Sequence, residues 1–140
     1  MWYHNNTEIT ELPEDAVGFV YIITNLTNNR MYIGKKLSQF SKTSTKTITT
    51  KDGTKKKKKI KSKVESDWMT YYGSSDHLNN DVKLLGEQNF KREILHFCKN
   101  KGTLSYLELR EQIDRRVMES EDYYNAFVGG KIHKKHIKLN

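Results

Sequence analysis

The sequence contains one cysteine, one proline and no long hydrophobic run. The lone Cys98 cannot form an internal disulfide or a cysteine-rich zinc site, so we expect a reducing compartment. No apolar stretch approaches the ~20 residues that span a bilayer. The first residues lack the basic and then apolar pattern of a secretory signal. For a chain of 140 residues, we therefore expect one intracellular, cytoplasmic domain.

Acidic side chains are nearly absent from residues 42–63. This segment holds ten lysines against one acid, Asp52, a charge of +9; since the whole chain carries +8, the remainder sums to −1. A positive charge concentrated in this way favours a polyanionic partner such as DNA or RNA. The alternative is a solvated, mobile loop with no partner.

This segment could adopt either of two structures. Its Thr-rich and Lys-rich halves could pair as a β-ribbon with Asp52-Gly53 at the tip, or lysine self-repulsion could keep it disordered until nucleic acid binds. We expect phosphate contacts from lysines here, after the second predicted strand and in the C-terminal tail. The candidate DNA-binding residues are Lys36, Lys42, Lys55, Lys56, Lys57, Lys58, Lys59, Lys61, Lys63, Lys131, Lys134 and Lys135.

A β-hairpin is predicted near the N-terminus. Residues 18–24 are rich in Val, Ile, Phe and Tyr, which are typical of strands. Residues 25–30 hold three Asn and a Thr, which suit a turn, and residues 31–34 are predicted as the returning strand. Tyr21 and Tyr32 lie on the two arms. Taken alone, they would be ordinary half-buried strand residues.

Several further elements are predicted from capping and turn residues. They are an irregular arm over residues 1–15, a short helix capped by Ser66, a helix from Ser75 or Asp76 to Gly86, and a strand over residues 90–97.

The clearest predicted helix covers residues 103–118, with Thr103 as its N-cap. Its principal apolar face is formed by Tyr106, Leu109, Ile113 and Val117. A second apolar stripe on the helix contains Glu111. A carboxylate among apolar side chains needs a cation, a metal or a hydrogen-bond partner; a solvated Glu111 at the margin of the stripe is the alternative.

The hairpin resembles the two motifs that name the GIY-YIG nuclease domain family. The first motif is present as Val20-Tyr21, preceded by Phe19 where the family has Gly. The second is intact as Tyr32-Ile33-Gly34, at the family's spacing from the first.

Three downstream elements resemble the family in the same order. They are a third strand at residues 90–95, a glutamate-bearing helix at residues 107–113 and a late Tyr124-Asn125 pair. The likeness is strongest to free-standing phage members, described as Seg-like homing endonucleases. A phage-encoded protein of this kind would act in the host cytoplasm.

The resemblance implies an α+β fold with a small central antiparallel three-stranded sheet flanked by helices. The likeness covers residues 17–128, which would form the nuclease domain. Residues 42–63 would be a lysine-rich insertion within it. Residues 1–16 would be an N-terminal arm and residues 129–140 a basic tail.

The function that the resemblance implies is metal-dependent hydrolysis of phosphodiester bonds in DNA, most simply double-stranded DNA. Tyr21 would be the base or the water-orienting group, and a nearby cation would have to lower its pKa from about 10. Lys35 would supply that charge or contact the scissile phosphate, and Tyr32 would position water or phosphate. Glu111 would be the single protein ligand of Mg²⁺, or of another divalent cation such as Mn²⁺. Asn125 would support the geometry.

One family residue is missing. The family has an arginine on the helix after its second motif, whereas this chain has no Arg between Arg30 and Arg92. The matching position holds Asp67, and either Lys63 or Lys42 could substitute, without the planar fork of Arg. The alternative function is a non-catalytic nucleic-acid-binding protein on a degenerate nuclease scaffold. An RNA-binding or RNA-cleaving variant is a third possibility.

Overall fold

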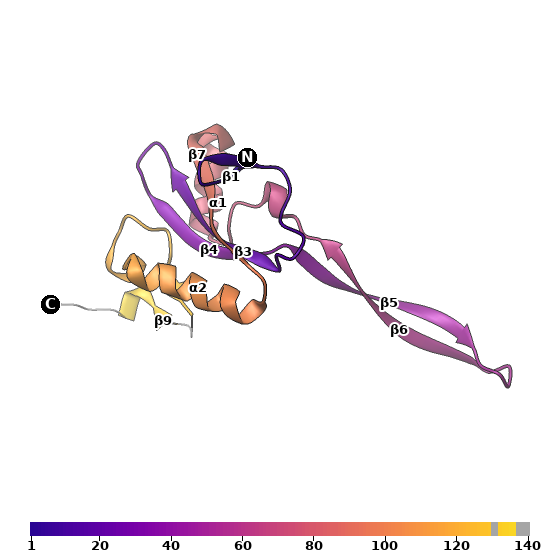
Figure 1. Cartoon of the computed structure of the whole chain (residues 1–140). Helices are drawn as coiled ribbons and strands as arrows, with labels where there is room; N and C mark the ends of the chain where they lie inside the picture. The colour runs from indigo at the N-terminus through magenta and orange to yellow at the C-terminus, as the bar shows by residue number, and fades with distance from the viewer. Residues whose placement is uncertain (130–131, 137–140) are drawn as a thin grey trace.

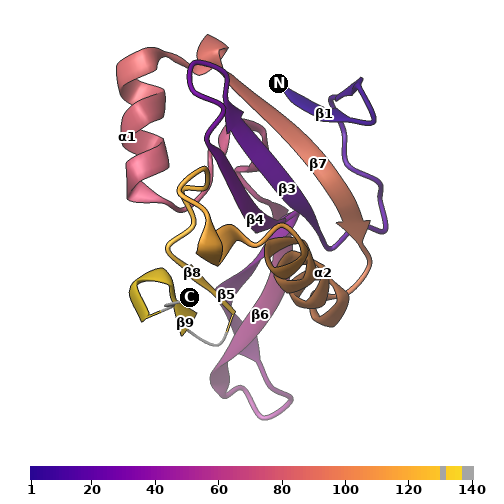
Figure 2. The ribbon, with the colours of Figure 1, turned by 90° about the vertical axis from the view of Figure 1, so that its left-hand side faces the viewer.

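A five-stranded mixed sheet forms the centre of the fold, in a computed structural model that describes residues 1–129 and 132–136. The strand order is β2-β1-β7-β3-β4, and neighbours are antiparallel except for the parallel pair β1 and β7 (Figures 1 and 2). The strands are β1 (Trp2–His4), β2 (Thr7–Ile9), β3 (Gly18–Asn25), β4 (Met31–Leu37) and β7 (Phe90–Cys98). The α+β class is confirmed, but the predicted sheet of three antiparallel strands is too small.

The two extra strands come from the N-terminal residues, which the sequence predicted as an irregular arm. Trp2 pairs with Arg92 of β7 and is 1% exposed. Its indole Nε1 donates a hydrogen bond to the backbone oxygen of Trp68 at 2.7 Å. Burial of this one large side chain holds β1 against the edge of β7, where it extends the sheet.

The β3–β4 hairpin is confirmed, and its register decides where the two tyrosines lie. Tyr21 pairs with Gly34 and Ile23 pairs with Tyr32, which puts both tyrosines on one face of the sheet. Their ring centroids are 6.2 Å apart. Because Gly34 has no side chain, the Tyr21 ring can lie directly over it; a Cβ at position 34 would collide with the Tyr21 hydroxyl.

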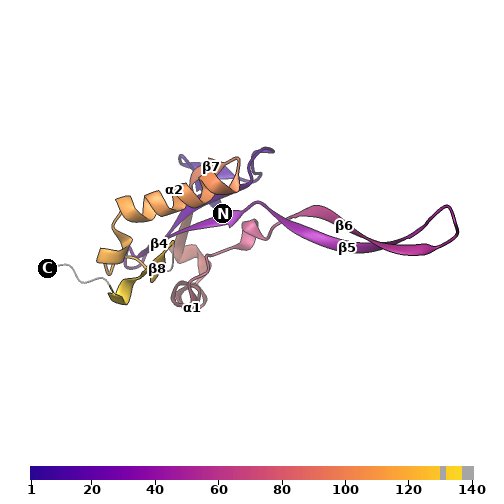
Figure 3. The same cartoon turned by 90° about the horizontal axis from the view of Figure 1, so that it is seen from below.

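The two α-helices cover opposite faces of the sheet (Figure 3). They are α1 (Asp76–Leu85) and α2 (Lys101–Asp114). Leu78 of α1 packs in the cluster that contains Tyr21, whereas Leu104 of α2 packs in the cluster that contains Val20. Both helices approach the β4 edge of the sheet, where the candidate site lies.

Helix α1 matches its predicted bounds, and the element before it does not. The Ser75 hydroxyl caps α1 by accepting a hydrogen bond from the Leu78 backbone N–H at 3.3 Å, and Gly86 ends the helix. The helix expected after Ser66 is a single 3₁₀ turn, η1 (Trp68–Thr70), because Tyr71 already has an extended backbone.

Helix α2 differs from its prediction at both ends and in its orientation. The helix begins at Lys101, where Asn100 Oδ1 accepts a hydrogen bond from the backbone N–H of Thr103, so Asn100 rather than Thr103 is the cap. It ends at Asp114, and soon afterwards Arg116 has a left-handed backbone with φ of 53°. The face predicted as principal was wrong for three of its four residues, since Tyr106, Leu109 and Ile113 are exposed. The fourth, Val117, is buried but lies after the helix, in the 3₁₀ turn η3 (Val117–Glu119). The buried residues of the helix itself are Leu104 and Gln112.

The lysine-rich segment forms a two-stranded antiparallel ribbon that projects away from the body (Figures 1 and 3). Its strands are β5 (Gln39–Thr49) and β6 (Lys55–Glu65), paired from Gln39↔Glu65 to Thr49↔Lys55 with Asp52-Gly53 in the turn. Every residue of both strands is exposed. Of the two predicted alternatives, the structure has the ribbon.

The remaining elements are short. They are the 3₁₀ turns η2 (Glu87–Asn89), η3 (Val117–Glu119) and η4 (Lys134–His136), and the paired strands β8 (Phe127–Val128) and β9 (Ile132–His133). Within residues 1–129 and 132–136, no helix combines the length and the apolar character needed to cross a membrane.

Candidate active site

A cavity of about 610 Å³ lies beside the edge strand β4, between the first turn of α1, helix α2 and residues 124–129. Figure 2 shows α1 and α2 flanking this edge, with β8 between them. Three of the five predicted catalytic residues line the cavity: Tyr32, Lys35 and Asn125. Segments far apart in the sequence therefore meet at this cavity.

Tyr32 and Asn125 are held by different kinds of contact. The Tyr32 hydroxyl shares a 2.9 Å hydrogen bond with the hydroxyl of Ser74, at the entrance to α1. Asn125 is 3% exposed, donates from Nδ2 to the Ile33 oxygen at 2.8 Å and accepts from the Ile33 N–H at 3.1 Å. Asn125 thus fixes the backbone between Tyr32 and Gly34.

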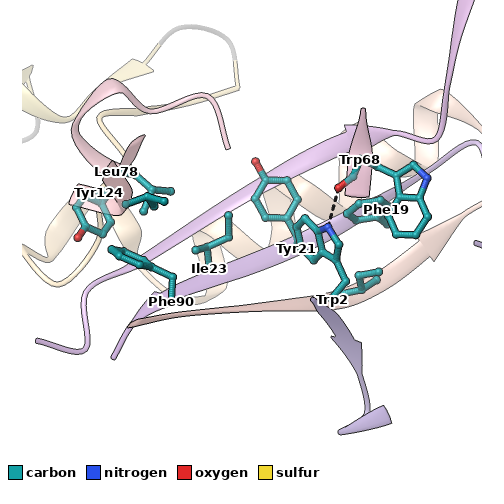
Figure 4. Close-up of a cluster of buried hydrophobic side chains, with 10 residues drawn as sticks. Trp2, Phe19, Tyr21, Ile23, Trp68, Leu78, Phe90 and Tyr124 are labelled. Carbon is teal, nitrogen blue, oxygen red and sulfur yellow. Dashed lines mark hydrogen bonds between the residues drawn. The ribbon is translucent and has the colours of Figure 1, made fainter. Parts of the chain in front are cut away.

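Tyr21 lies behind Tyr32 and does not line the cavity. It is 1% exposed and packs edge-on against Trp2, with ring centroids 5.4 Å apart (Figure 4). Burial, followed by the neighbouring Tyr32 and Tyr71 hydroxyls, raises the pKa of Tyr21 well above 10. The phenol is therefore neutral near physiological pH in these surroundings, which disfavours a role as general base.

Lys35 leaves β4 on the face opposite to Tyr21, since it pairs with Val20. Its Nζ donates a hydrogen bond to the Ser105 hydroxyl at 2.8 Å and lies 3.9 Å from the Glu108 carboxylate. Of the two roles predicted for Lys35, contact with a phosphate at the cavity agrees with this position; lowering the pKa of Tyr21 does not.

Glu111 does not line the cavity. One of its carboxylate oxygens lies 2.8 Å from Nε2 of His96, and the other accepts a 2.9 Å hydrogen bond from Nε of Arg115. Burial raises the pKa of Glu111, but these two hydrogen bonds outweigh it and lower the pKa overall. The structure therefore does not bring the predicted metal ligand to the other predicted residues.

Glu108, one turn earlier on α2, lines the cavity instead. Burial raises the pKa of its carboxyl, and Lys35 offsets part of that rise. The sequence held a signal for this residue: Leu104, Glu108 and Gln112 are spaced four apart and share one helix face. The signal was missed because two of the three are polar, so the apolar pattern pointed to another face.

Gln112 also lines the cavity. The residue is 5% exposed, and its Nε2 donates a hydrogen bond to the Ile33 oxygen at 3.1 Å. Its Oε1 is buried and has no hydrogen-bond partner in the part of the chain that the structure describes. An unsatisfied buried acceptor costs about 1–3 kcal/mol, so a bound water or cation beside it would repay that cost.

The position of the missing arginine is not filled by either predicted lysine. Lys42 and Lys63 lie on the ribbon and do not line the cavity. Asp67 forms an ion pair with Lys36 at 2.6 Å. Of the described residues, the basic side chains that line the cavity are Lys35 and His77, the latter from the first turn of α1.

The other predicted DNA-binding lysines fall in two places. Those at positions 55–59, 61 and 63 lie along β6. Lys134 and Lys135 line a separate hollow beside Arg30. Lys134 donates hydrogen bonds to the backbone oxygens of Ser120 and Tyr123, and burial lowers its pKa. Lys131 lies outside the described residues.

Comparisons with known proteins identify a family. The family described as "Putative endonuclease segE, GIY-YIG domain" matches residues 2–128. A protein of Enterobacteria phage T4, "Putative endonuclease segE", is 31% identical over 112 residues, which are 80% of this chain and 42% of that protein. The chain thus spans less than half the length of this relative. No solved structure matches.

Proposed function

The chain belongs to the SegE-type GIY-YIG endonuclease domain family, and from this membership and the cavity we propose that it is a metal-dependent endonuclease of the homing type that hydrolyses phosphodiester bonds in double-stranded DNA. The observation that carries the proposal is the meeting of Tyr32, Lys35 and Glu108 in one cavity. Its place of action would be the cytoplasm, as expected from the sequence.

The residues at the cavity fit a hard divalent cation such as Mg²⁺ or Mn²⁺. Glu108 offers a carboxylate whose ionisation is penalised by burial, so a cation beside it would be favoured. The unpaired Oε1 of Gln112 offers a second oxygen, directly or through a bound water. Across residues 1–129 and 132–136, no three His, Cys, Asp or Glu side chains gather to hold a metal by themselves. Water and phosphate oxygens would therefore complete the ligand set, as Mg²⁺ tolerates.

Each cavity residue then has a physical task. A divalent cation there supplies positive charge to the phosphate and lowers the pKa of a bound water. Glu108 would hold the cation, replacing Glu111 in that predicted role. Lys35 would neutralise the phosphate in place of the missing arginine, and His77 would form a hydrogen bond with it. Tyr32 would orient water or phosphate by its hydroxyl, and buried Tyr21 would support Tyr32 from behind.

The test is incubation of supercoiled plasmid with the full chain and Mg²⁺. We expect nicking or linearisation by the wild type and by Glu111→Gln, and loss of cleavage in Glu108→Gln. The two variants make the same change of charge on the same helix, so they separate the cavity from the helix as a whole. Equal loss in both variants would contradict the assignment of Glu108.

One observation favours the second function, a non-catalytic nucleic-acid-binding protein. The family arginine is absent, and lysine lacks its bidentate geometry. Failure of the wild type to cut any plasmid, linear duplex or structured RNA, with salt-sensitive binding retained by Glu108→Gln, would establish this alternative. Cleavage of the RNA alone would establish the RNA variant.

A further inference from the structure

The β5–β6 ribbon presents lysines on both of its faces. Because side chains alternate along a strand, one face carries the β6 lysines at odd positions, opposite serine and threonine. The other face carries lysines from both strands. The first set is Lys55, Lys57, Lys59, Lys61 and Lys63; the second is Lys42, Lys46, Lys56 and Lys58.

The paired ribbon has little stability of its own. A two-stranded hairpin is marginally stable in water, and every residue of this one is exposed. Lys46 and Lys58 are also directly paired across the strands, where like charges repel. A polyanion along the ribbon would remove that repulsion.

The size of the ribbon fits the major groove of duplex DNA. Eleven residues at about 3.3 Å each extend to about 36 Å. One turn of B-DNA rises about 34–36 Å along its axis, so a ribbon that follows the winding groove covers less than one turn. The major groove is about 12 Å wide and admits a two-stranded ribbon.

The base of the ribbon is anchored to the strand that carries the site. Ser38 alone separates β4 from β5, and its backbone N–H donates a hydrogen bond to the Val17 oxygen at 2.9 Å. On the β6 side, the Ser66 hydroxyl donates to the Leu37 oxygen at 2.6 Å. The ribbon therefore continues from Tyr32 and Lys35 through fixed backbone, so its position on DNA would set the position of the cavity.

We propose that the β5–β6 ribbon enters the major groove of double-stranded DNA edge-first, over less than one turn, with one lysine face toward each of the two phosphate backbones that line the groove. The inference rests on the proposed function for its partner. The role of the ribbon is to contact phosphates and to fix the position of the protein along the DNA. It takes no part in hydrolysis, since its lysines do not line the cavity.

The experiment measures duplex binding by the full chain carrying Glu108→Gln, across a salt series. One variant replaces Lys57, Lys59 and Lys61 by Gln, and a second replaces Lys46, Lys56 and Lys58. A control replaces Lys83, Lys91 and Lys99, which lie off the ribbon. Since each phosphate contact contributes about 0.9 to the slope of log K against log salt, we expect either face variant to reduce the slope by about 2–3 and the control to leave it unchanged.

A shortened ribbon tests the groove. Residues 44–60 are replaced by Asn-Gly, which joins the paired residues Thr43 and Lys61 through a hairpin turn. We expect the parent to protect guanine N7, a major-groove atom, from dimethyl sulfate over less than one turn, and the shortened chain to lose that protection.

Three results would overturn the proposal: a change in slope from one face only, a slope unaffected by shortening, or no N7 protection by the parent. Plasmid cleavage by the wild type is scored separately. Cleavage by the wild type together with DNA binding that does not depend on the ribbon would reject the proposed role of the ribbon and support the nuclease function. Ribbon-dependent N7 protection without cleavage would support the role of the ribbon and reject the nuclease function.

Discussion

Glu108 and Glu111 lie one turn apart on α2, and their surroundings shift the pKa values of their carboxyls in opposite directions. Burial raises the pKa of Glu108, only partly offset by Lys35. At Glu111 the effect of burial is exceeded by hydrogen bonds from His96 and Arg115, which lower the pKa. Ionised Glu111 therefore stabilises the fold, whereas ionisation of Glu108 lowers the stability of the fold. Shifted pKa values of this kind are common for functional carboxylates.

The first prediction is that the two Glu→Gln variants change stability in opposite directions at neutral pH. The folded pKa of Glu111 lies below its ordinary value of 4.5, so its contribution is full above that pH and is lost as pH falls through the folded pKa. The folded pKa of Glu108 lies above 4.5, so its cost appears as pH rises through the folded pKa.

Urea unfolding between pH 3 and 8 measures both effects. Glu111→Gln should be less stable than the wild type at pH 7 and approach it in acid. Glu108→Gln should be more stable at pH 7 and lose that advantage in acid. The same sign for both variants at pH 7 would show that burial is not what distinguishes the two sites.

The sequence predicted the hairpin and α1 because their signals are local. The strand-turn-strand pattern of residues 18–34 and the cap at Ser75 each depend on a few neighbouring residues. The ribbon was one of two alternatives for its segment. Its turn residues are a local signal, but whether the two strands stay paired depends on charge repulsion between lysines across the ribbon.

The sequence did not predict the N-terminal strands or the position of Glu108, because both depend on tertiary packing. The three-residue strand of Trp2 forms because its indole is buried under Trp68, 66 positions away. Glu108 faces the cavity because Leu104 fixes the rotation of α2 on the sheet. Apolar periodicity instead selected Tyr106 and Ile113, which the structure leaves exposed.

The second prediction contrasts two glycines. Gly34→Ala should destabilise the protein by about 1–3 kcal/mol, because its Cβ would overlap the Tyr21 ring, which is enclosed in the core. Gly102→Ala lies near the start of α2 with its nearest neighbouring atom at 3.5 Å, and should stabilise by up to about 1 kcal/mol. Denaturant midpoints measure both changes in stability. An unchanged midpoint in Gly34→Ala would show that the Tyr21 ring can move aside.

The third prediction concerns the N-terminal strand. Trp2→Ala should cost about 3–5 kcal/mol, as for other buried aromatic residues, since the ring packs at 5.1 Å from Phe19 and donates to Trp68. Tyr3→Ala, on the next residue of the same strand and only partly buried, is the control and should cost about 1 kcal/mol or less. Similar urea midpoints for both variants would mean that β1 contributes backbone pairing rather than core.

The fourth prediction tests whether Gln112, as well as Glu108, supplies an oxygen to the proposed cation. Gln112→Leu removes both the bond to Ile33 and the unpaired Oε1. Because the Ile33 oxygen keeps its bond from Asn125, and the unsatisfied acceptor leaves with the side chain, stability should change by less than about 1 kcal/mol. Mn²⁺ affinity, measured by calorimetry or electron paramagnetic resonance, should fall on the order of tenfold.

Gln112→Glu completes that test. A second carboxylate one turn after Glu108 on the same helix face should tighten Mn²⁺ binding, because it adds an ionised oxygen where an amide oxygen stood. Glu111→Gln, whose carboxylate is occupied by His96 and Arg115, should leave the affinity unchanged. If Gln112→Leu and Gln112→Glu both bind Mn²⁺ like the wild type while Glu108→Gln does not, the cation depends on Glu108 alone. The unpaired oxygen of Gln112 would then have to face a water that makes no contact with the ion.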